Sequence, residues 1–326
     1  MSIKFYIPEY NNQNLKRASF RFRAIIPLKG MRPEDGIISH IEQAKQGDIV
    51  VLAKKSKPKD IYQLRERNIK CVYDICDNKW RKQVATNWVE KVIMPHNEMC
   101  MKADAIVTTC QSMRELILDN VNKDSFIVND PYEVDKSEPN INFNEKIIVF
   151  NYGNSKHFNR FDWNEFLDKM SNIDFEIHCM LDRVKKFKDR NNLLTQRHTN
   201  IFLHEYDYNK QKELMKKCDI VFLPIIALDN NQALDISVKS PNRIIDALMS
   251  GKPVITNAGV ETYKPFMPFA DFSKTNYEDF ANTFLRLLNM KKEFIHNRIV
   301  EGQKYIEQNH SPEVIGKQWI ELENKV

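Results

Sequence analysis

The segment 239–255, KSPNRIIDALMSGKPVI, contains the residue types of an anion-binding helix start. Ser240 and Pro241 are typical of a helix N-cap and of the first helical position. A helix N-terminus exposes unpaired backbone N–H groups and a partial positive charge, and Lys239 and Arg243 add two cations within one turn of it. The segment therefore predicts a site for a diphosphate.

The same helix carries a candidate ribose ligand. Asn242, Arg243 and Asp246 are three or four residues apart, so they can share one helix face. A carboxylate one turn beyond a phosphate site is well placed to accept hydrogen bonds from ribose hydroxyls. The alternative is an ordinary helix with a surface ion pair between Arg243 and Asp246, ended by Gly251 in a left-handed cap. The local chemistry alone leaves both interpretations open.

The elements around this segment alternate between short β-like runs and amphipathic helical runs. The expected strands are 19–27, 48–53, 70–75, 105–109 and 125–129 in the first half, and 146–152, 174–180, 200–203, 219–224 and 253–257 in the second. The expected helices are 59–67, 112–120, 163–170, 210–217, 241–250, 277–288, 291–308 and one that begins at Pro312. This order predicts an α/β fold of two doubly wound, parallel-sheet domains. Their boundary is expected at 130–144, where Pro131 and Pro139 interrupt the periodicity.

The segment 239–255 resembles the donor-binding segment of the large group of GT-B glycosyltransferases typified by family 4, also called group 1. Weaker similarity to these enzymes extends over most of the chain, through 19–27, 72–77, 103–109, 147–154 and 218–224. The resemblance implies two facing Rossmann-like domains around a central cleft. Residues 1–134 would bind the acceptor, 135–311 would bind the nucleotide-sugar, and a last helix, 312–326, would pack back on the first domain.

Residue roles follow from the same resemblance. Gly153 and Asn154 would form the phosphate-side loop. The diphosphate would be bound by Lys239, Ser240 and Arg243, with Asn242 on the same helix face. Asp246 would bind the ribose. These families often carry an acid eight residues before the ribose acid, at the donor sugar, and this sequence has Val238 there, so the sugar is left open.

The catalytic base is less well defined by the sequence. Asp77 follows the strand 70–75, at the carboxyl edge where doubly wound sheets bind ligands. Asp74 is an alternative to it, and an acid at this place could also cap the next helix. His96 is a second candidate, with a structural histidine as the alternative. Arg21 and Arg23 are expected on one face of a strand, where they would meet an anionic acceptor or pair with nearby acids.

Composition limits the remaining possibilities. The net charge is +5, and residues 1–60 hold twelve Lys or Arg against six Asp or Glu. This basic first part suits an anionic acceptor or an anionic membrane surface, or is an ordinary solvated surface; no nucleic-acid module accompanies it. The six cysteines are expected to be reduced core residues. No D-x-D pair occurs among the 326 residues, so neither a metal nor another cofactor is expected.

The expected function is therefore that of a metal-independent, hexosyltransferase-type enzyme. It would move a sugar from a nucleoside-diphosphate sugar to a saccharide or lipid-linked acceptor, in cell-surface polysaccharide or lipopolysaccharide assembly. The alternatives are a nucleotide-sugar epimerase of the same fold and a non-catalytic nucleotide-binding subunit. Because the sequence has no long apolar segment and no signal peptide, we expect a cytoplasmic protein, with peripheral membrane contact through its basic first domain.

Overall fold

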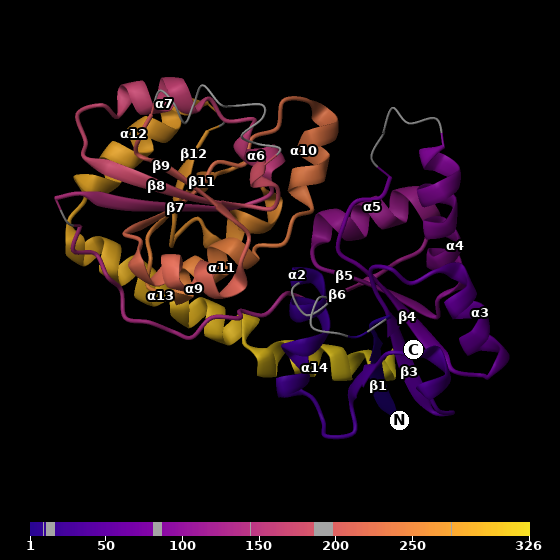
Figure 1. Ribbon diagram of the computed structural model, residues 1–326. Coiled ribbons are helices and arrows are strands. Elements are labelled where there is room, and N and C mark those ends of the chain that lie inside the picture. The colour runs from indigo at the N-terminus through magenta and orange to yellow at the C-terminus, as the bar shows by residue number, and fades with distance from the viewer. Residues whose placement is uncertain (9, 11–16, 81–86, 144, 186–197, 275) are drawn as a thin grey trace. The chain divides into compact units, whose positions relative to one another are not determined.

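The computed structural model describes residues 1–8, 10, 17–80, 87–143, 145–185, 198–274 and 276–326. Contacts between Cα atoms divide the chain into two units. The first contains Met1–Glu133, Val238–Asn242 and Glu307–Val326, and the second contains Val134–Ser237 and Arg243–Ile306. Each unit has its own six-stranded parallel sheet flanked by helices (Figure 1), so the predicted α/β, doubly wound class is confirmed.

The first unit contains a sheet of strand order β2-β1-β3-β4-β5-β6. Its strands are β1 Ser2–Tyr6, β2 Gly36–Ile38, β3 Asp48–Leu52, β4 Lys70–Ile75, β5 Ala105–Thr108 and β6 Phe126–Ile127. Its helices are α2 Ala18–Phe20, η1 Arg21–Ile25, η2 Pro27–Gly30, η3 Ile41–Gln43, α3 Pro58–Glu66, η4 Val89–Ile93, α4 Met94–Lys102, α5 Gln111–Val121, α14 Pro312–Glu321 and η6 Leu322–Asn324. The chain forms β2 on one side of β1 and then crosses to the other side, where β3, β4, β5 and β6 follow one another in order.

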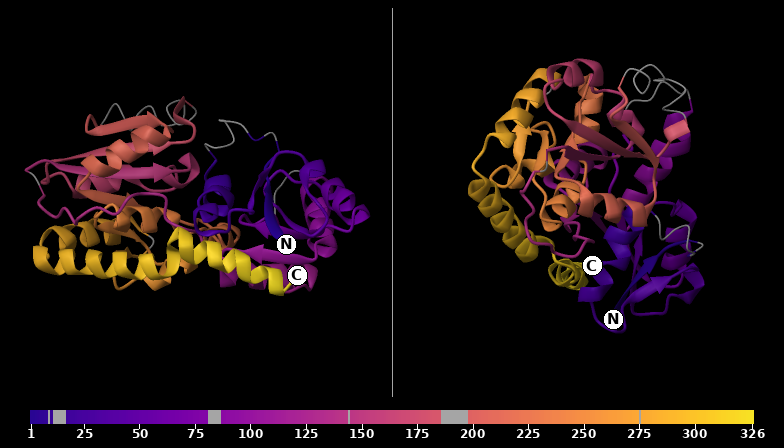
Figure 2. Two further views of the ribbon diagram at one scale, coloured as in Figure 1. Left: turned by 90° about the horizontal axis from the view of Figure 1, so that it is seen from below. Right: turned by 60° about the vertical axis from the view of Figure 1, so that its left-hand side comes forward.

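Both faces of the first sheet are buried. Along β3, Ile49 and Val51 join one apolar cluster, and Val50 and Leu52 join the other, because side chains alternate across a strand. The helices α3 and α5 cover the second cluster, while α14 adds Trp319 to the first. Both termini belong to this unit and lie near one another in both views of Figure 2. A strand buried on both faces reads as a continuous apolar run, as β3 does.

The expected strand 19–27 is wrong. Residues 18–25 are helical instead, as α2 followed by the π-helix η1. The alternation of Phe20, Arg21, Phe22 and Arg23 mimics a strand, but all four side chains are buried. Phe20 and Ala24, four residues apart, enter the same apolar cluster, which is helical spacing. The first strand of the sheet is β1.

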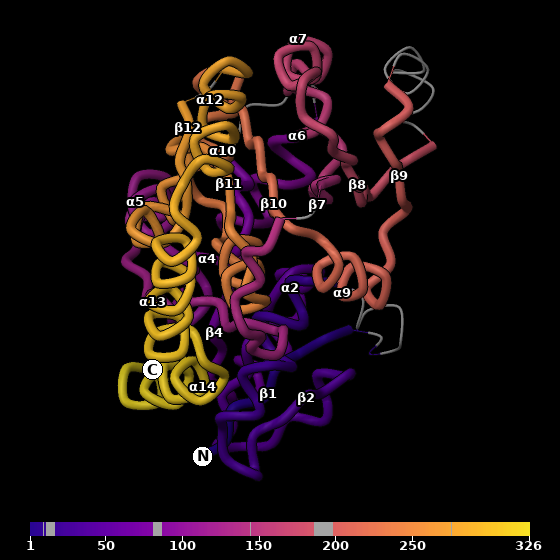
Figure 3. The backbone as a smooth tube through the Cα atoms, turned by 90° about the vertical axis from the view of Figure 1, so that its left-hand side faces the viewer, coloured from indigo at the N-terminus to yellow at the C-terminus, as the bar shows by residue number. Residues whose placement is uncertain are grey.

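The second unit contains a sheet of strand order β12-β11-β10-β7-β8-β9, which can be followed in Figure 3. Its strands are β7 Ile147–Gly153, β8 Phe175–Leu181, β9 Ile201–Glu205, β10 Ile220–Leu223, β11 Val254–Asn257 and β12 Asp271–Ser273. Its helices are α6 Ser155–Phe158, α7 Trp163–Lys169, α9 Tyr208–Lys217, α10 Asn230–Ser237, α11 Asn242–Met249, η5 Glu261–Phe266, α12 Tyr277–Leu288 and most of α13 Lys292–His310. All paired strands run parallel.

Aromatic side chains form the core on one face of the second sheet. Phe161, Trp163 and Phe166, at and before α7, contact Phe222 of β10 with ring centroids 5.0 to 5.9 Å apart. Phe280 of α12 completes the cluster, 5.3 Å from Phe222. Edge-to-face and offset pairs of this kind add specific contacts to the burial of apolar area. This cluster fixes β10, whose last residues border the site described below.

Two further expectations are tested by the fold. All six cysteines are free thiols, and Cys71, Cys100, Cys179 and Cys218 are buried as predicted, whereas Cys76 and Cys110 are only half-buried. Across the described residues, no helix combines the length and the apolar character that a bilayer crossing requires.

Candidate functional site

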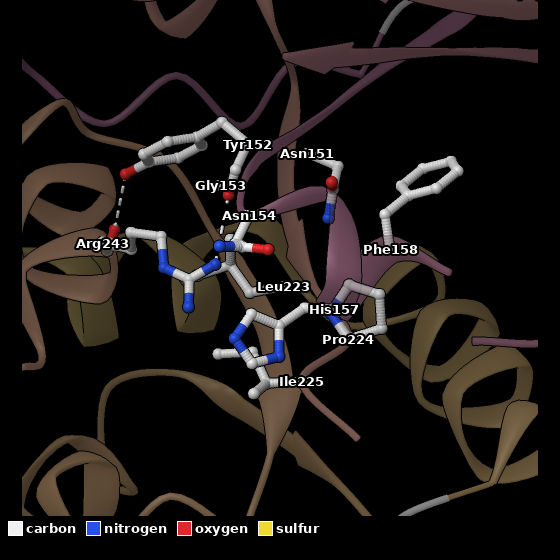
Figure 4. A pocket seen from close by; sticks show the side chains of 10 residues that line it. All are labelled: Asn151, Tyr152, Gly153, Asn154, His157, Phe158, Leu223, Pro224, Ile225 and Arg243. Atoms are coloured by element: carbon white, nitrogen blue, oxygen red, sulfur yellow. Dashed lines mark hydrogen bonds between the residues drawn. The ribbon is translucent and has the colours of Figure 1, made fainter. Parts of the chain in front are cut away.

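The second unit has a pocket at the carboxyl ends of β7 and β10 (Figure 4). From β7 the chain builds the sheet outward through β8 and β9, and then returns to the other side of β7 with β10. The pocket therefore lies at the topological switch point, where open α/β sheets bind their ligands. Its lining residues are Asn151, Tyr152, Gly153, Asn154, His157, Phe158, Leu223, Pro224, Ile225 and Arg243.

Arg243 brings a cation to this pocket. Its Nη1 donates to the carbonyl oxygen of Tyr152 at 3.1 Å, and the Tyr152 hydroxyl donates back to the Arg243 carbonyl at 3.0 Å. These two hydrogen bonds join the start of α11 to the end of β7 (Figure 4). No carboxylate of the described residues forms an ion pair with Arg243. The guanidinium is thus held in place without being neutralised, which suits an anionic ligand.

Gly153 is needed for this arrangement. Its φ of +141° lies in a region that favours glycine. A Cβ at this position would lie 2.6 Å from Nη1 of Arg243, so a side chain would displace the guanidinium. Asn154 follows as the N-cap of α6, and its side chain accepts a hydrogen bond from the Lys156 backbone N–H at 2.9 Å. The structure thus brings Gly153, Asn154 and Arg243 together in one pocket.

His157 is a pocket residue that the sequence interpretation missed. It lies on α6, three residues after Asn154, and its imidazole faces the same space as the Arg243 guanidinium (Figure 4). A helix of four residues has no measurable periodicity, so no hydrophobic pattern pointed to it. The available signal was its distance from the predicted glycine turn at Gly153. An imidazole can donate a hydrogen bond to a phosphate oxygen.

Lys239, Ser240 and Asn242 do not line this pocket and cluster with the first unit. The Ser240 hydroxyl accepts a hydrogen bond from the Asn242 backbone N–H at 3.2 Å, so it satisfies one of the free N–H groups at the start of α11. The helix begins at Asn242, one residue later than expected. Nζ of Lys239 lies 3.5 Å from Oδ1 of Asp77.

Asp246 also lies outside the pocket lining. It is 2% exposed, on the part of α11 where every residue from Ile244 to Met249 is buried. Its proposed contact with a ribose remains a prediction. Val238, at the place where the sequence resemblance implies an acid, is fully buried in an apolar cluster of the first unit. The side chain at that position is therefore part of the core.

Asp77 lies at the carboxyl end of β4, as expected, between two lysines. Lys54 forms an ion pair with its Oδ2, and Lys239 approaches its Oδ1. Burial alone would raise the pKa of Asp77, but the ammonium groups of Lys54 and Lys239 outweigh burial and lower it. Asp77 is therefore ionised at neutral pH, with its side chain 29% exposed. An ionised carboxylate at this edge can accept a hydrogen bond from a ligand hydroxyl.

His96 is a buried, neutral imidazole on α4. Its Nδ1 shares a hydrogen bond of 2.8 Å with the Tyr73 hydroxyl, and its ring packs against Trp80 at 4.5 Å. Burial, with a smaller contribution from Lys79, lowers the pKa of His96 to about 3. Its Nε2 has no hydrogen-bond partner among the described residues. A neutral ring of this kind can act as a base only where an acceptor reaches Nε2.

Arg21 and Arg23 pair with acidic side chains, which is the second of the two possibilities that the sequence left open. Arg21 binds Glu133 through two hydrogen bonds of 2.7 and 3.0 Å. Arg23, 2% exposed, binds Asp74 at 2.8 Å and Asp130 at 3.0 Å. Burial would lower the pKa of Arg23, but the two carboxylates raise it. Because these contacts occupy buried guanidinium groups, neither arginine presents a free cation to a ligand in this structure.

Comparisons with known proteins place the fold. No family model matches this chain, and no curated protein matches it. A trehalose-6-phosphate structure from E. coli, bound with UDP-2-fluoro glucose, is similar with a TM-score of 0.68 and 9% identity, over 100% of this chain and 99% of that one. A UDP-forming trehalose-phosphate synthase from Burkholderia xenovorans gives 0.62 and 11%, over 96% and 79%.

The crystal structure of TarM is similar with a TM-score of 0.61 and 16% identity, over 85% of this chain. This chain spans 55% of the TarM chain. The structures in this group belong to glycosyltransferases of the GT-B type. The chain therefore has the GT-B fold, with two Rossmann-like units, as the sequence resemblance implied.

Proposed function

We propose that this protein is a glycosyltransferase that moves a hexosyl group from a nucleoside-diphosphate sugar to a saccharide or lipid-linked acceptor. The observation that carries the proposal is the Arg243 guanidinium, held without a carboxylate partner among the described residues, in a pocket at the switch point of the second sheet. The GT-B fold supports it. The setting we propose is cell-surface polysaccharide or lipopolysaccharide assembly, in the cytoplasm or at the inner face of the membrane.

Glycosyl transfer needs stabilisation of the departing diphosphate. In this proposal Arg243 supplies a charge-assisted hydrogen bond to a phosphate oxygen, and the Gly153 turn lets the diphosphate approach the backbone. Lys239, Ser240 and Asn242 add contacts at the start of α11, and Asp246 binds the ribose. With cations neutralising the leaving group, no metal is required. The UDP-sugar analogue in the E. coli structure suggests UDP-sugars as the first donors to test.

The acceptor hydroxyl needs a base or a hydrogen-bond acceptor. Of the two candidates, Asp77 is the better placed, because it is ionised, partly exposed and at the carboxyl edge of β4. His96 has its Nδ1 engaged with Tyr73 and is 4% exposed. We therefore assign the contact with the acceptor hydroxyl to Asp77 and keep His96 as the second candidate.

The donor assignment is tested by calorimetric titration with UDP-, GDP-, dTDP- and CMP-linked sugars. Arg243→Ala is expected to weaken binding of the donor by roughly 10- to 100-fold, because a charge-assisted hydrogen bond contributes about 1.5–3 kcal/mol. Arg286→Ala is the matched control, since Arg286 lies on the exposed side of α12 and its partner Asp271 keeps Arg298. Equal affinity in wild type and Arg243→Ala would contradict the site.

Turnover separates the enzyme from its alternatives. Acceptor-dependent release of a nucleoside diphosphate supports a transferase, and its loss in Asp77→Asn supports the base assignment. An altered sugar formed without an acceptor would identify an epimerase of the same fold. Binding of the nucleotide-sugar with no turnover on any acceptor would indicate a nucleotide-binding subunit.

A further inference from the structure

Cationic side chains gather near Asp77 at the carboxyl edge of the first sheet. Lys54 lies two residues beyond β3, Asp77 lies two residues beyond β4, and these strands are paired neighbours. Lys54 and Lys239 contact opposite oxygens of the Asp77 carboxylate. The positive charge of Lys79 also acts to lower the pKa of Asp77. The positive charge of Arg17 acts to lower the pKa of Lys54, against the stronger effect of Asp77. We call Arg17, Lys54 and Lys79 the basic cluster; Lys239, which the proposed function places at the diphosphate, is not a member of it.

Asp77 cannot neutralise this cluster. Neither Lys79 nor Arg17 forms an ion pair with a carboxylate within the part of the chain that the structure describes. Lys54 has Asp77 as its one carboxylate partner in that same part. Within the described residues, one carboxylate therefore accompanies the three cations of the basic cluster. Like charges held together without counterions raise the electrostatic energy, and a bound anion lowers it.

The cluster is also accessible. The side chain of Lys54 is 39% exposed, Lys79 is half-buried and Arg17 is exposed, so a ligand can reach all three side chains. Arg21 and Arg23, by contrast, are buried against carboxylates. Of the basic residues in the first sixty, Arg17 and Lys54 are therefore accessible to a ligand at this edge, whereas Arg21 and Arg23 are not.

The position of the cluster is that of a ligand site. The chain leaves β1 in one direction to form β2 and returns to the other side to form β3, so the switch point of the first sheet lies between β1 and β3. Lys54 follows β3, which borders that point. Ligands of doubly wound sheets bind outside the carboxyl ends of strands at such a point.

We propose that the basic cluster binds a phosphoryl group of the acceptor, with Lys54 as its main contact and with Asp77 holding the Lys54 and Lys239 ammonium groups in position. Two lysines and an arginine near one point match a dianionic phosphate, to which lysine binds as a compact charge. The proposal rests on the function proposed above, since it names the acceptor class of that reaction. The acceptor hydroxyl would then lie beside Asp77.

Calorimetry with inorganic phosphate tests the cluster itself. The titration uses the full chain carrying Arg243→Ala, so that the cation of the donor pocket is removed. Adding Lys54→Gln is expected to weaken phosphate binding by roughly 10-fold or more, as loss of a charge-assisted contact predicts. Adding Lys102→Gln is the control, because Lys102 ends α4 just before β5 begins, at the opposite edge of the sheet.

The outcomes are distinct. Equal phosphate affinity in the Lys54→Gln and Lys102→Gln chains would overturn the proposal. In the otherwise wild-type chain, Lys54→Gln should leave the affinity for the nucleotide-sugar donor unchanged. A loss of donor affinity of roughly 10-fold would also overturn the proposal, because Lys54 would then be a donor-binding residue. If no nucleotide-sugar binds any variant, the glycosyltransferase proposal fails, while the phosphate titration still decides the cluster.

The source of the phosphoryl group is tested separately. Glucose 1-phosphate represents a soluble acceptor, and phosphatidylcholine vesicles with and without phosphatidic acid represent a lipid surface. Lys54-dependent binding of the sugar phosphate, with none to either vesicle, assigns a soluble acceptor. Lys54-dependent binding only to vesicles that contain phosphatidic acid assigns a lipid-borne phosphate. If Lys54→Gln changes the binding of neither glucose 1-phosphate nor the phosphatidic acid vesicles, the proposal is contradicted.

Discussion

His96 combines a buried imidazole with a hydrogen bond to Tyr73 and ring contacts to Tyr73 and Trp80. Burial lowers its pKa from 6.5 to about 3 in the folded chain. The folded state therefore favours the neutral ring, and the unfolded state binds a proton first as the pH falls. The stability that comes from this difference is fully present above pH 6.5 and decreases between pH 6.5 and about 3.

We expect His96→Phe to flatten the pH dependence of unfolding of the first unit. The wild-type chain should lose about 2 kcal/mol of His96-linked stability at pH 5 relative to pH 7.5, at about 1.4 kcal/mol for each pH unit below 6.5. Urea unfolding of the two chains at both pH values measures this difference. A slope that is the same in wild type and His96→Phe would show that His96 does not titrate in this way.

The sequence predicted some residues of the pocket and not others, for identifiable reasons. Gly153 and Arg243 belong to a glycine turn and a helix start, and both motifs specify backbone geometry that the fold preserves. The pairing of Lys239 with Asp77 joins side chains 162 positions apart, so no local pattern reports it. The partners of Arg21 and Arg23 are also distant in sequence. Motifs therefore predicted the glycine turn and the helix start that border the pocket, but not which cations are paired with carboxylates.

At the level of elements, α11 ends in a motif that the sequence predicted. Gly251 has φ +70°, its N–H donates to the Leu248 carbonyl, and the Lys252 N–H donates to the Ala247 carbonyl. This is the Schellman arrangement, in which both N–H groups turn back onto the last carbonyls of the helix. A Cβ at Gly251 would also lie 2.4 Å from the carbonyl oxygen of Glu138.

Gly251→Ala should therefore destabilise the second unit by more than backbone strain alone. Positive φ costs a non-glycine residue roughly 1 kcal/mol, and the contact with Glu138 adds to it. Gly47→Ala is the control, because Gly47 has φ +90° but open space around its Cβ position. Urea unfolding of both variants compares them. An equal loss of stability would indicate that the segment at Glu138 moves aside without cost.

The elements that the sequence missed are short or lack a simple period. The strands β2 and β12 have three residues each, and a run of that length has no reliable alternation. The sequence pattern does not predict β1, and it favours 19–27 as the first strand because the Phe-Arg alternation there has period two. That alternation is misleading because both arginines are buried and paired with acids that are distant in the sequence. Longer runs such as 70–75 and 277–288 were predicted with their observed bounds.

At the scale of the whole molecule, the two units have separate cores. Trp319 of α14 is fully buried against Phe5 of β1, with ring centroids 5.1 Å apart, in the first unit. Trp163 of α7 stacks on Phe158 at 4.3 Å in the second unit, and Phe158 lines the pocket. The chain supplies α14 from its end, so the first core is completed only by residues far along the sequence.

Replacing each tryptophan by alanine should therefore give opposite results. Either change costs about 3–5 kcal/mol in its own core. Trp319→Ala should lower hydrogen-exchange protection in β1, β3 and β4 and weaken phosphate binding at the basic cluster, with nucleotide binding to the pocket preserved. Trp163→Ala should lower protection in β7 and β10 and abolish nucleotide binding, with phosphate binding preserved. If each variant lost both phosphate binding and nucleotide binding, the two units would unfold together. In a single cooperative unfolding transition, damage to either core removes both sites.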